Sequence, residues 1–117
     1  MQAATENIIV VKSKNFALKA IKLYRYLIDE KREYVLSRHF LRSSTSIGAN
    51  VKEAIRGQSN ADFGAKMNIA LKEASETEYW LELLYESEYI DETSYNSIIE
   101  DNRELIKILT MIVKNAE

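Results

Sequence analysis

The chain has 117 residues, 46% of them hydrophobic and 29% charged, and a formal net charge of −2 at pH 7, which suits one soluble domain with one core. It has no cysteine, which excludes disulfides and thiolate metal sites and fits the reducing cytoplasm. It also has no proline, so long helices can run uninterrupted.

The N-terminal region contains one apolar run, residues 8–11, which is too short for a signal-peptide core or a membrane span. Residues 1–7 have no pattern, so we divide the chain into a flexible N-terminal segment, residues 1–12, and a domain of residues 13–117. The first helix is predicted over about residues 13–33. It carries two apolar stripes, which are Phe16, Ala20, Leu23 and Leu27, and Leu18, Ile21 and Ile28. Because two stripes need two neighbours, we expect this helix to contact both the bundle and a second subunit.

The second helix is predicted from an N-cap at Ser37 to about Arg56, and Gly57 is suited to end it. Seven of the eight side chains at residues 43–50 are small or polar. Gly48 costs about 1 kcal/mol relative to alanine in a helix interior, so this stretch predicts a close helix crossing or a bend. The residues predicted to face the core are Phe40, Ile47, Val51 and Ala54.

The third helix is predicted to begin at an N-cap on Ser59, with Asp62 three residues on, and the fourth runs from an N-cap on Asp91 to about Asn115. Both carry a core stripe of three- and four-residue steps. The stripes are Phe63, Met67, Ala70, Ala74, Thr77, Leu81 and Leu84, and Tyr95, Ile98, Asn102, Leu105, Leu109 and Ile112. Short connections force antiparallel neighbours, so we predict an all-α fold, an antiparallel up-and-down four-helix bundle in a single domain.

Residues 46–53, Ser-Ile-Gly-Ala-Asn-Val-Lys-Glu, carry the most specific part of a resemblance. It also includes residues 34–37, Arg42, residues 70–71, Glu76, Glu78 and residues 81–83. In this pattern the chain resembles the 23S rRNA intervening-sequence proteins, a group of small bacterial four-helix-bundle proteins, over about residues 16–112. The signature residues of the resemblance are Ser46, Ile47, Gly48, Ala49, Asn50, Glu53, Glu76 and Glu78. The family commonly has proline where this chain has Gly48 and glycine where it has Ala54, so we expect a weaker bend.

The resemblance implies a homo-oligomer, typically a pentamer arranged as a ring. Accessory proteins of diversity-generating retroelements are similar to this family, and in them a basic surface is proposed to contact nucleic acid. A reverse transcriptase is the implied partner if the gene belongs to a retroelement. Many family members are encoded inside insertions in large-subunit rRNA genes, which does not by itself prove binding to that RNA.

Charge is divided between the two halves of the chain, because residues 1–58 carry 11 basic and 5 acidic side chains and residues 59–117 carry 5 basic and 13 acidic ones. A basic stripe on the second helix and further cations on the first are predicted to contact the phosphates of RNA or DNA. The alternatives are a solvated face, or contact with the acidic row of residues 78, 82 and 86 in a neighbouring copy. The predicted nucleic-acid-binding residues are Arg38, Arg42, Lys52, Arg56, Lys19, Lys22 and Arg25.

Enzyme motifs are missing from the sequence. The only histidine, His39, has Leu36 where a di-iron Glu-x-x-His motif requires glutamate, and there is no phosphate-binding glycine loop or zinc-protease helix. Asn50 and Glu53 lie one turn apart and are predicted to join Arg42, or Glu76 or Glu78, in a buried polar network rather than a catalytic site. We therefore predict no enzyme activity, no cofactor and no metal.

Three functions remain. The leading prediction is a ring-like homo-oligomer that binds structured nucleic acid through its basic face. The first alternative is a self-assembling scaffold for a protein partner. The second is a metal-dependent nuclease in which Glu73 and Glu76 share a divalent ion. A membrane partner is not expected.

Overall fold

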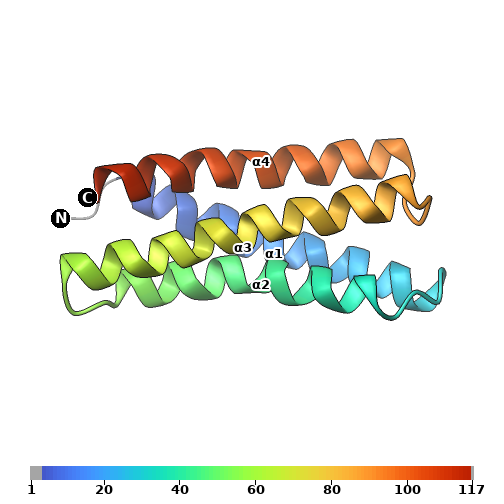
Figure 1. The fold of residues 1–117 in the computed structure, drawn as a ribbon, viewed down its shortest axis with the longest axis horizontal. Helices are drawn as coiled ribbons and strands as arrows, with labels where there is room; N and C mark the ends of the chain where they lie inside the picture. The colour runs from blue at the N-terminus through green and yellow to red at the C-terminus, as the bar shows by residue number, and fades with distance from the viewer. Residues whose placement is uncertain (1–3, 117) are drawn as a thin grey trace.

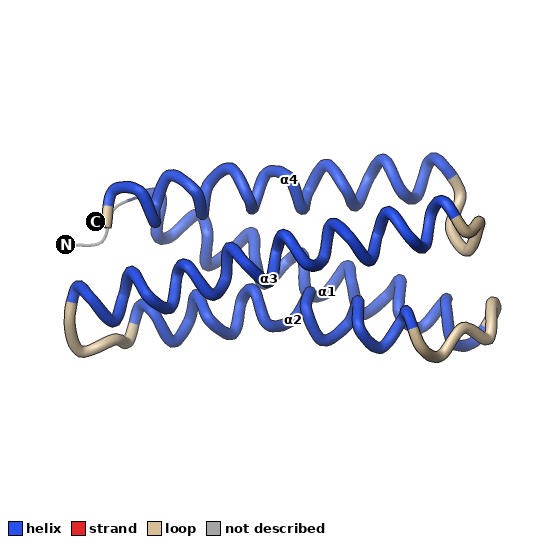
Figure 2. Tube along the Cα trace, in the orientation of Figure 1, coloured by secondary structure: helices blue, strands red, loops and turns tan. Residues whose placement is uncertain are grey.

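Four antiparallel helices make up the computed structural model, which describes residues 4–116 and the side chains of residues 7–116. The helices are α1 (Ala4–Asp29), α2 (Leu36–Ile55), α3 (Asn60–Glu86) and α4 (Glu92–Asn115). Each packs against two neighbours in the order α1, α2, α3, α4 and back to α1, and the bundle measures 45 × 20 × 19 Å (Figure 1). Short turns join consecutive helices at the two ends (Figure 2). This confirms the predicted fold class.

The N-caps of α3 and α4 are those predicted. The Ser59 side chain accepts from the backbone N–H of Asp62 at 3.0 Å, and the Asp91 side chain accepts from that of Ser94 at 2.8 Å. Each bond satisfies one of the four backbone donors that have no partner inside the first turn of a helix. The sequence therefore places both helix starts correctly.

The predicted N-cap of α2 at Ser37 is wrong. This helix begins at Leu36, and the buried carboxylate of Glu33 accepts from the backbone N–H groups of Val35, Leu36 and Ser37 at 3.1, 2.9 and 2.7 Å. Ser37 lies inside the first turn, where its hydroxyl donates to the Glu33 carbonyl oxygen at 2.7 Å. The turn before it contains Arg32 with φ of 53°, which folds Glu33 back over the helix start. A carboxylate thus replaces the predicted hydroxyl cap.

The first helix starts nine residues before the predicted boundary at Ser13. Residues 4–12, assigned from the sequence to a flexible segment, continue α1, and residues 1–3 lie outside the described part of the chain. Ile9 explains the longer helix, since its side chain is fully buried in the core. It lies seven residues before Phe16, two helical turns earlier on the same face. The helix also ends earlier than predicted, at Asp29.

The core contains most of the predicted seam residues. On α3 and α4 every predicted core position is buried except Phe63 and Tyr95, which are partly buried. The two stripes of α1 differ, because Phe16, Ala20 and Leu27 are buried whereas Leu18 is 53% exposed. Ile21 and Ile28 of the second stripe are partly buried.

Gly48 lies where α2 approaches α1, as predicted for a close crossing. A methyl group added at Gly48 would lie 3.4 Å from Oγ of Ser13 and 3.5 Å from its carbonyl carbon and oxygen, which is ordinary van der Waals contact. The crossing therefore does not require glycine. None of the four helices, over residues 4–116, is long and apolar enough to cross a membrane.

Candidate nucleic-acid interface

Three cations mark the outward face of α2. Arg38, Lys52 and Arg56 are exposed, and none forms an ion pair with another residue of the described structure. Fourteen residues separate Arg38 from Lys52, which is close to four helical turns, so both side chains leave the helix on nearly the same side. Arg56 follows one turn later. The structure thus places three of the predicted basic residues on one solvent-facing stripe.

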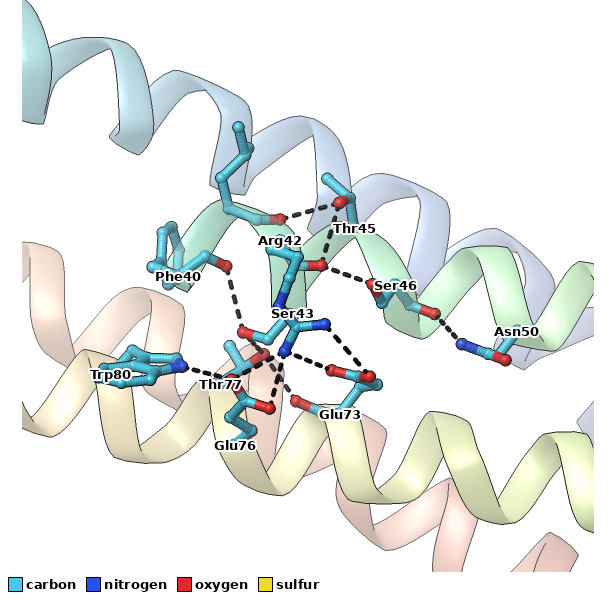
Figure 3. Close-up of polar contacts among 11 residues, drawn as sticks. Phe40, Arg42, Ser43, Thr45, Ser46, Asn50, Glu73, Glu76, Thr77 and Trp80 are labelled. Carbon is cyan, nitrogen blue, oxygen red and sulfur yellow. Dashed lines mark hydrogen bonds and ion pairs between the residues drawn. The ribbon is translucent and has the colours of Figure 1, made fainter. Parts of the chain in front are cut away.

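Arg42, the fourth predicted member of this stripe, is turned toward α3. Its guanidinium donates to both carboxylate oxygens of Glu76 at 2.8 Å and to Glu73 at 3.2 and 3.5 Å (Figure 3). Arg42 is four residues from Arg38, a rotation of about 40° around the helix, and its long side chain spans the remaining gap. Arg42 therefore clamps α2 to α3. The three- and four-residue steps in the sequence did not distinguish Arg42 from the solvent-facing residues Arg38, Lys52 and Arg56.

The predicted basic residues of α1 are divided in the same way. Lys19 is occupied at the contact with α4, where its ammonium lies 2.6 Å from Asp101 and 2.7 Å from the Ser97 hydroxyl. Lys22 and Arg25 are exposed and form no ion pair within the described residues. Five of the seven predicted residues are therefore exposed and without an ion pair among the described residues; four lie on the neighbouring helices α1 and α2, and Arg56 directly follows α2.

The signature residues do not form one shared network. The Ser46 hydroxyl donates to the Arg42 carbonyl oxygen at 2.6 Å, and the Asn50 amide donates to the Ser46 carbonyl oxygen at 2.8 Å, so both bond to their own helix (Figure 3). Glu53 pairs with Lys66 of α3 at 3.0 Å.

The remaining signature residues have separate environments. Glu78 pairs with Arg103 of α4 at 3.0 Å. Ile47 is buried in the core, and Ala49 is exposed on the outer face of α2. The predicted buried network is wrong, because in the described structure neither Asn50 nor Glu53 bonds to Arg42, Glu76 or Glu78. Arg42 pairs with Glu76 instead. Of the polar signature residues, Glu53 and Glu76 bridge the seam between α2 and α3.

Glu76 joins this seam to an aromatic pair that sequence reasoning missed. The Trp80 indole N–H donates to Glu76 at 2.8 Å, and the His39 ring stacks on Trp80 with centroids 4.7 Å apart and planes 16° from parallel. The Trp80 hydrogen bond is the main cause that lowers the pKa of Glu76; burial opposes it and the Arg42 guanidinium adds to it. Only the four-residue spacing of Glu76 and Trp80 hinted at this contact.

The carboxylates considered for a metal ion are Glu73 and Glu76, and both are engaged by the Arg42 guanidinium. A cation already occupies the space between them. Within residues 4–116 no group of three or more His, Cys, Asp or Glu side chains is arranged to bind a metal ion. The geometry gives no support to a two-carboxylate nuclease site.

A surface hollow of about 750 Å³ lies at the turn between α2 and α3, next to the basic stripe. It was not predicted from the sequence. Its lining mixes charges, since Lys52, Arg56 and Lys66 face it together with Glu53 and Asp62. Gly57 is favoured here, because an added methyl group would meet the Asp62 carboxylate and lie 3.0 Å from the Ala54 carbonyl oxygen.

Comparisons with known proteins agree with this architecture. The chain is similar, with 52% identity and a TM-score of 0.93, to a protein of unknown function from the S23 ribosomal protein family of Bacteroides thetaiotaomicron VPI-5482, known from a crystal structure at 1.70 Å resolution. The match covers 94% of this chain and 98% of that one. No match is found among curated proteins. The sequence pattern of the 23S rRNA-intervening sequence proteins matches residues 5–111, so the chain belongs to that family.

Proposed function

We propose that this protein is a non-catalytic, cytoplasmic, homo-oligomeric protein that binds structured nucleic acid through a basic face. We define the basic face by four residues of α1 and α2 and one that directly follows α2, which are Lys22, Arg25, Arg38, Lys52 and Arg56. The observation that carries the proposal is that these five cations are exposed and form no ion pair in the described structure.

Unpaired cations can contact phosphates without first breaking an internal ion pair. Each Lys or Arg that neutralises a phosphate releases counterions, which makes binding strongly dependent on salt and tolerant of sequence. The net charge of the whole chain is −2, so a basic binding surface must be local. In the structure α1 and α2 pack against each other, so the basic face extends over two adjacent helices that a folded RNA or DNA could contact.

The test is a charge-reversal variant with a matched control. Changing Arg38, Lys52 and Arg56 together to glutamate should weaken binding of a labelled structured RNA by at least tenfold and make the log–log salt slope shallower by about one per lost phosphate contact. The control changes to glutamate three other exposed cations on α3 and α4 that form no ion pair with a described residue, namely Lys72, Lys107 and Lys114. Binding that is absent at low salt, or that falls equally in both triple variants, would contradict the proposal.

Self-assembly is supported by exposed apolar side chains on the outer face of α1. Val11 is 57% exposed and Leu18 is 53% exposed, and they lie two turns apart on one side of the helix. On α3, Glu82 and Glu86 form no ion pair with another described residue. A ring of identical subunits, with a pentamer as the expected size, would bring the outer face of one copy to the acidic row of the next.

The same exposed apolar residues favour one alternative, a scaffold that assembles and holds a protein partner without any nucleic-acid role. A reverse transcriptase is the partner to test if the gene lies in a retroelement. In that case the variant with glutamate at residues 38, 52 and 56 should still assemble and bind the protein partner. Nucleic acid should bind neither this variant nor the unmodified protein.

A further inference from the structure

A layer of fully buried polar side chains crosses the middle of the apolar core. Ser43 and Ser44 of α2, Thr77 of α3 and Asn102 of α4 are all 0% exposed. The Thr77 hydroxyl donates to Ser43 Oγ at 2.8 Å, and Asn102 Nδ2 donates to the Ala74 carbonyl oxygen at 2.9 Å. Ala74 and Thr77 are three residues apart on α3, about 4.5 Å along the helix, so the four side chains lie at one level of the bundle.

Two atoms of this polar layer have no hydrogen-bond partner among the described residues. They are Ser44 Oγ and Asn102 Oδ1. The orientation of the Asn102 amide is fixed, because the Ala74 carbonyl can only accept and must therefore face the amide nitrogen. Burying a polar atom without a hydrogen bond carries a desolvation penalty, and native cores rarely leave such atoms unsatisfied. Both atoms therefore require a partner.

No described residue of α2, the helix opposite α4, donates to Asn102 Oδ1. α2 and α4 lie diagonally across the bundle, and no Cα atoms of these two described helices approach within 8 Å. The Ser44 hydroxyl can rotate to donate to a carbonyl of its own helix, as Ser46 and Thr45 do at 2.6 and 2.8 Å. Such a rotation satisfies Ser44 but leaves Asn102 Oδ1 without a donor.

We propose that the polar layer holds an internal water molecule that donates to Asn102 Oδ1 and hydrogen-bonds to Ser44 Oγ. Buried waters in proteins typically bind two to four otherwise unsatisfied polar groups. At this level the water connects α2 to α4, the diagonal pair whose backbones do not meet. Together with the bonds from Thr77 and Asn102 to their partners, it links α2, α3 and α4 through polar contacts that depend on helix register.

A crystal structure of the unmodified protein at about 1.5 Å resolution or better tests the site directly. The expected result is one ordered solvent peak within about 3.2 Å of both Asn102 Oδ1 and Ser44 Oγ. A layer without solvent density, or a water that contacts only one of the two atoms, would overturn the proposal.

A mutant cycle tests the same link in solution. Ser44→Ala should lower the denaturant midpoint of the unmodified chain, where it removes a partner of the water. In an Asn102→Leu chain the leucine displaces the water, so Ser44→Ala should leave the midpoint unchanged or raise it. The control is Ser13→Ala, another buried serine, whose hydroxyl bonds to the Val10 carbonyl of its own helix and should give equal shifts in both chains.

Equal effects of Ser44→Ala in the two chains would refute the shared water. If Asn102→Leu fails to fold, the crystallographic result alone decides, because it needs no variant.

Discussion

Glu33 shows how one residue sets the start of a helix. Its carboxylate accepts three backbone N–H groups at the first turn of α2, where the positive end of the helix dipole also favours a negative charge. Burial raises the pKa of Glu33, but the hydrogen bonds from Leu36, Ser37 and Val35 together outweigh burial and lower the pKa below 4.5. The ionised side chain therefore stabilises the fold.

Replacing this cap should reduce stability in a pH-dependent way. Because the pKa of Glu33 is lower in the folded chain, its contribution is complete above about pH 4.5 and is lost as the pH falls through the folded value. Glu33→Gln should cost about 1–2 kcal/mol at pH 7, since the amide keeps only one acceptor oxygen, its NH2 group cannot accept from the remaining backbone donors, and it carries no charge. Urea denaturation at several pH values measures the difference, which should shrink toward zero near pH 2.

The matched control for this prediction is Glu30→Gln, an exposed neighbour outside the cap, which should change stability by less than about 0.5 kcal/mol. A Glu33→Gln deficit that stays constant from pH 7 to pH 2 would mean that the charge of the cap is unimportant.

Gly48 and Gly57 lead to opposite predictions. Gly48→Ala should stabilise the protein by up to about 1 kcal/mol, because alanine favours the helix and the new methyl group meets Ser13 at an ordinary distance of 3.4 Å. Gly57→Ala should destabilise it, because its methyl group would lie 3.0 Å from the Ala54 carbonyl oxygen. Thermal melts of both variants check this pair, and a Gly48→Ala protein that melts lower would show that the crossing does need glycine.

At the scale of the helices, polar clamps link the side chains that face each seam. Arg42 joins α2 to two glutamates of α3, Glu78 of α3 pairs with Arg103 of α4, and Lys19 of α1 pairs with Asp101 of α4. These groups are partly exposed, so each clamp adds only a modest amount to stability. Each clamp also neutralises a cation that could otherwise bind an anionic ligand.

Arg38 and Arg42 are one turn apart and should separate stability from binding. Arg42→Ala should cost about 1 kcal/mol in urea denaturation, because it leaves Glu73 and Glu76 unpaired within one turn of each other. Arg38→Ala should change stability by less than about 0.5 kcal/mol but weaken nucleic-acid binding more than Arg42→Ala does. The reverse order of binding losses would place the interface on the seam between α2 and α3 instead of the outer face of α2.

For the whole molecule, the division of charge follows the order of the helices. The basic half of the chain forms α1 and α2, and the acidic half forms α3 and α4, so the bundle has two sides of opposite charge. Ion pairs within the bundle neutralise part of this charge. Assembly should depend on the surface of α1 that carries the exposed apolar residues Val11 and Leu18.

Assembly can be tested with one substitution on that surface. Native mass spectrometry at micromolar concentration should show a homo-oligomer, with five copies expected, and Leu18→Glu should shift it to smaller species because a charge is buried at the contact. Val35→Glu is the control, since Val35 is 63% exposed and lies in the turn before α2. A strictly monomeric parent protein, or equal dissociation of both variants, would contradict the proposed assembly.

The sequence alone determined the fold class, the caps at Ser59 and Asp91, and nearly all of the core of α3 and α4. These features depend on local periodicity and on side chains that bond to their own backbone, which a single helix specifies. The same periodicity placed Phe16, Ala20 and Leu27 of α1 in the core but missed the start of the helix, because Ile9 joins a core that exists only when all four helices are packed. Likewise, the Glu33 cap requires a turn with a positive φ at Arg32 that no spacing rule indicates.

Only the tertiary structure decided which of the predicted basic residues form ion pairs inside the bundle. In the sequence Arg38 and Arg42, or Lys19 and Lys22, are equivalent members of one basic pattern. In the bundle Arg42 and Lys19 reach carboxylates of neighbouring helices, whereas Arg38 and Lys22 are exposed without an ion pair in the described structure. The physical reason is that an ion pair depends on the distance between helices that are far apart in the chain, and that distance is set by packing.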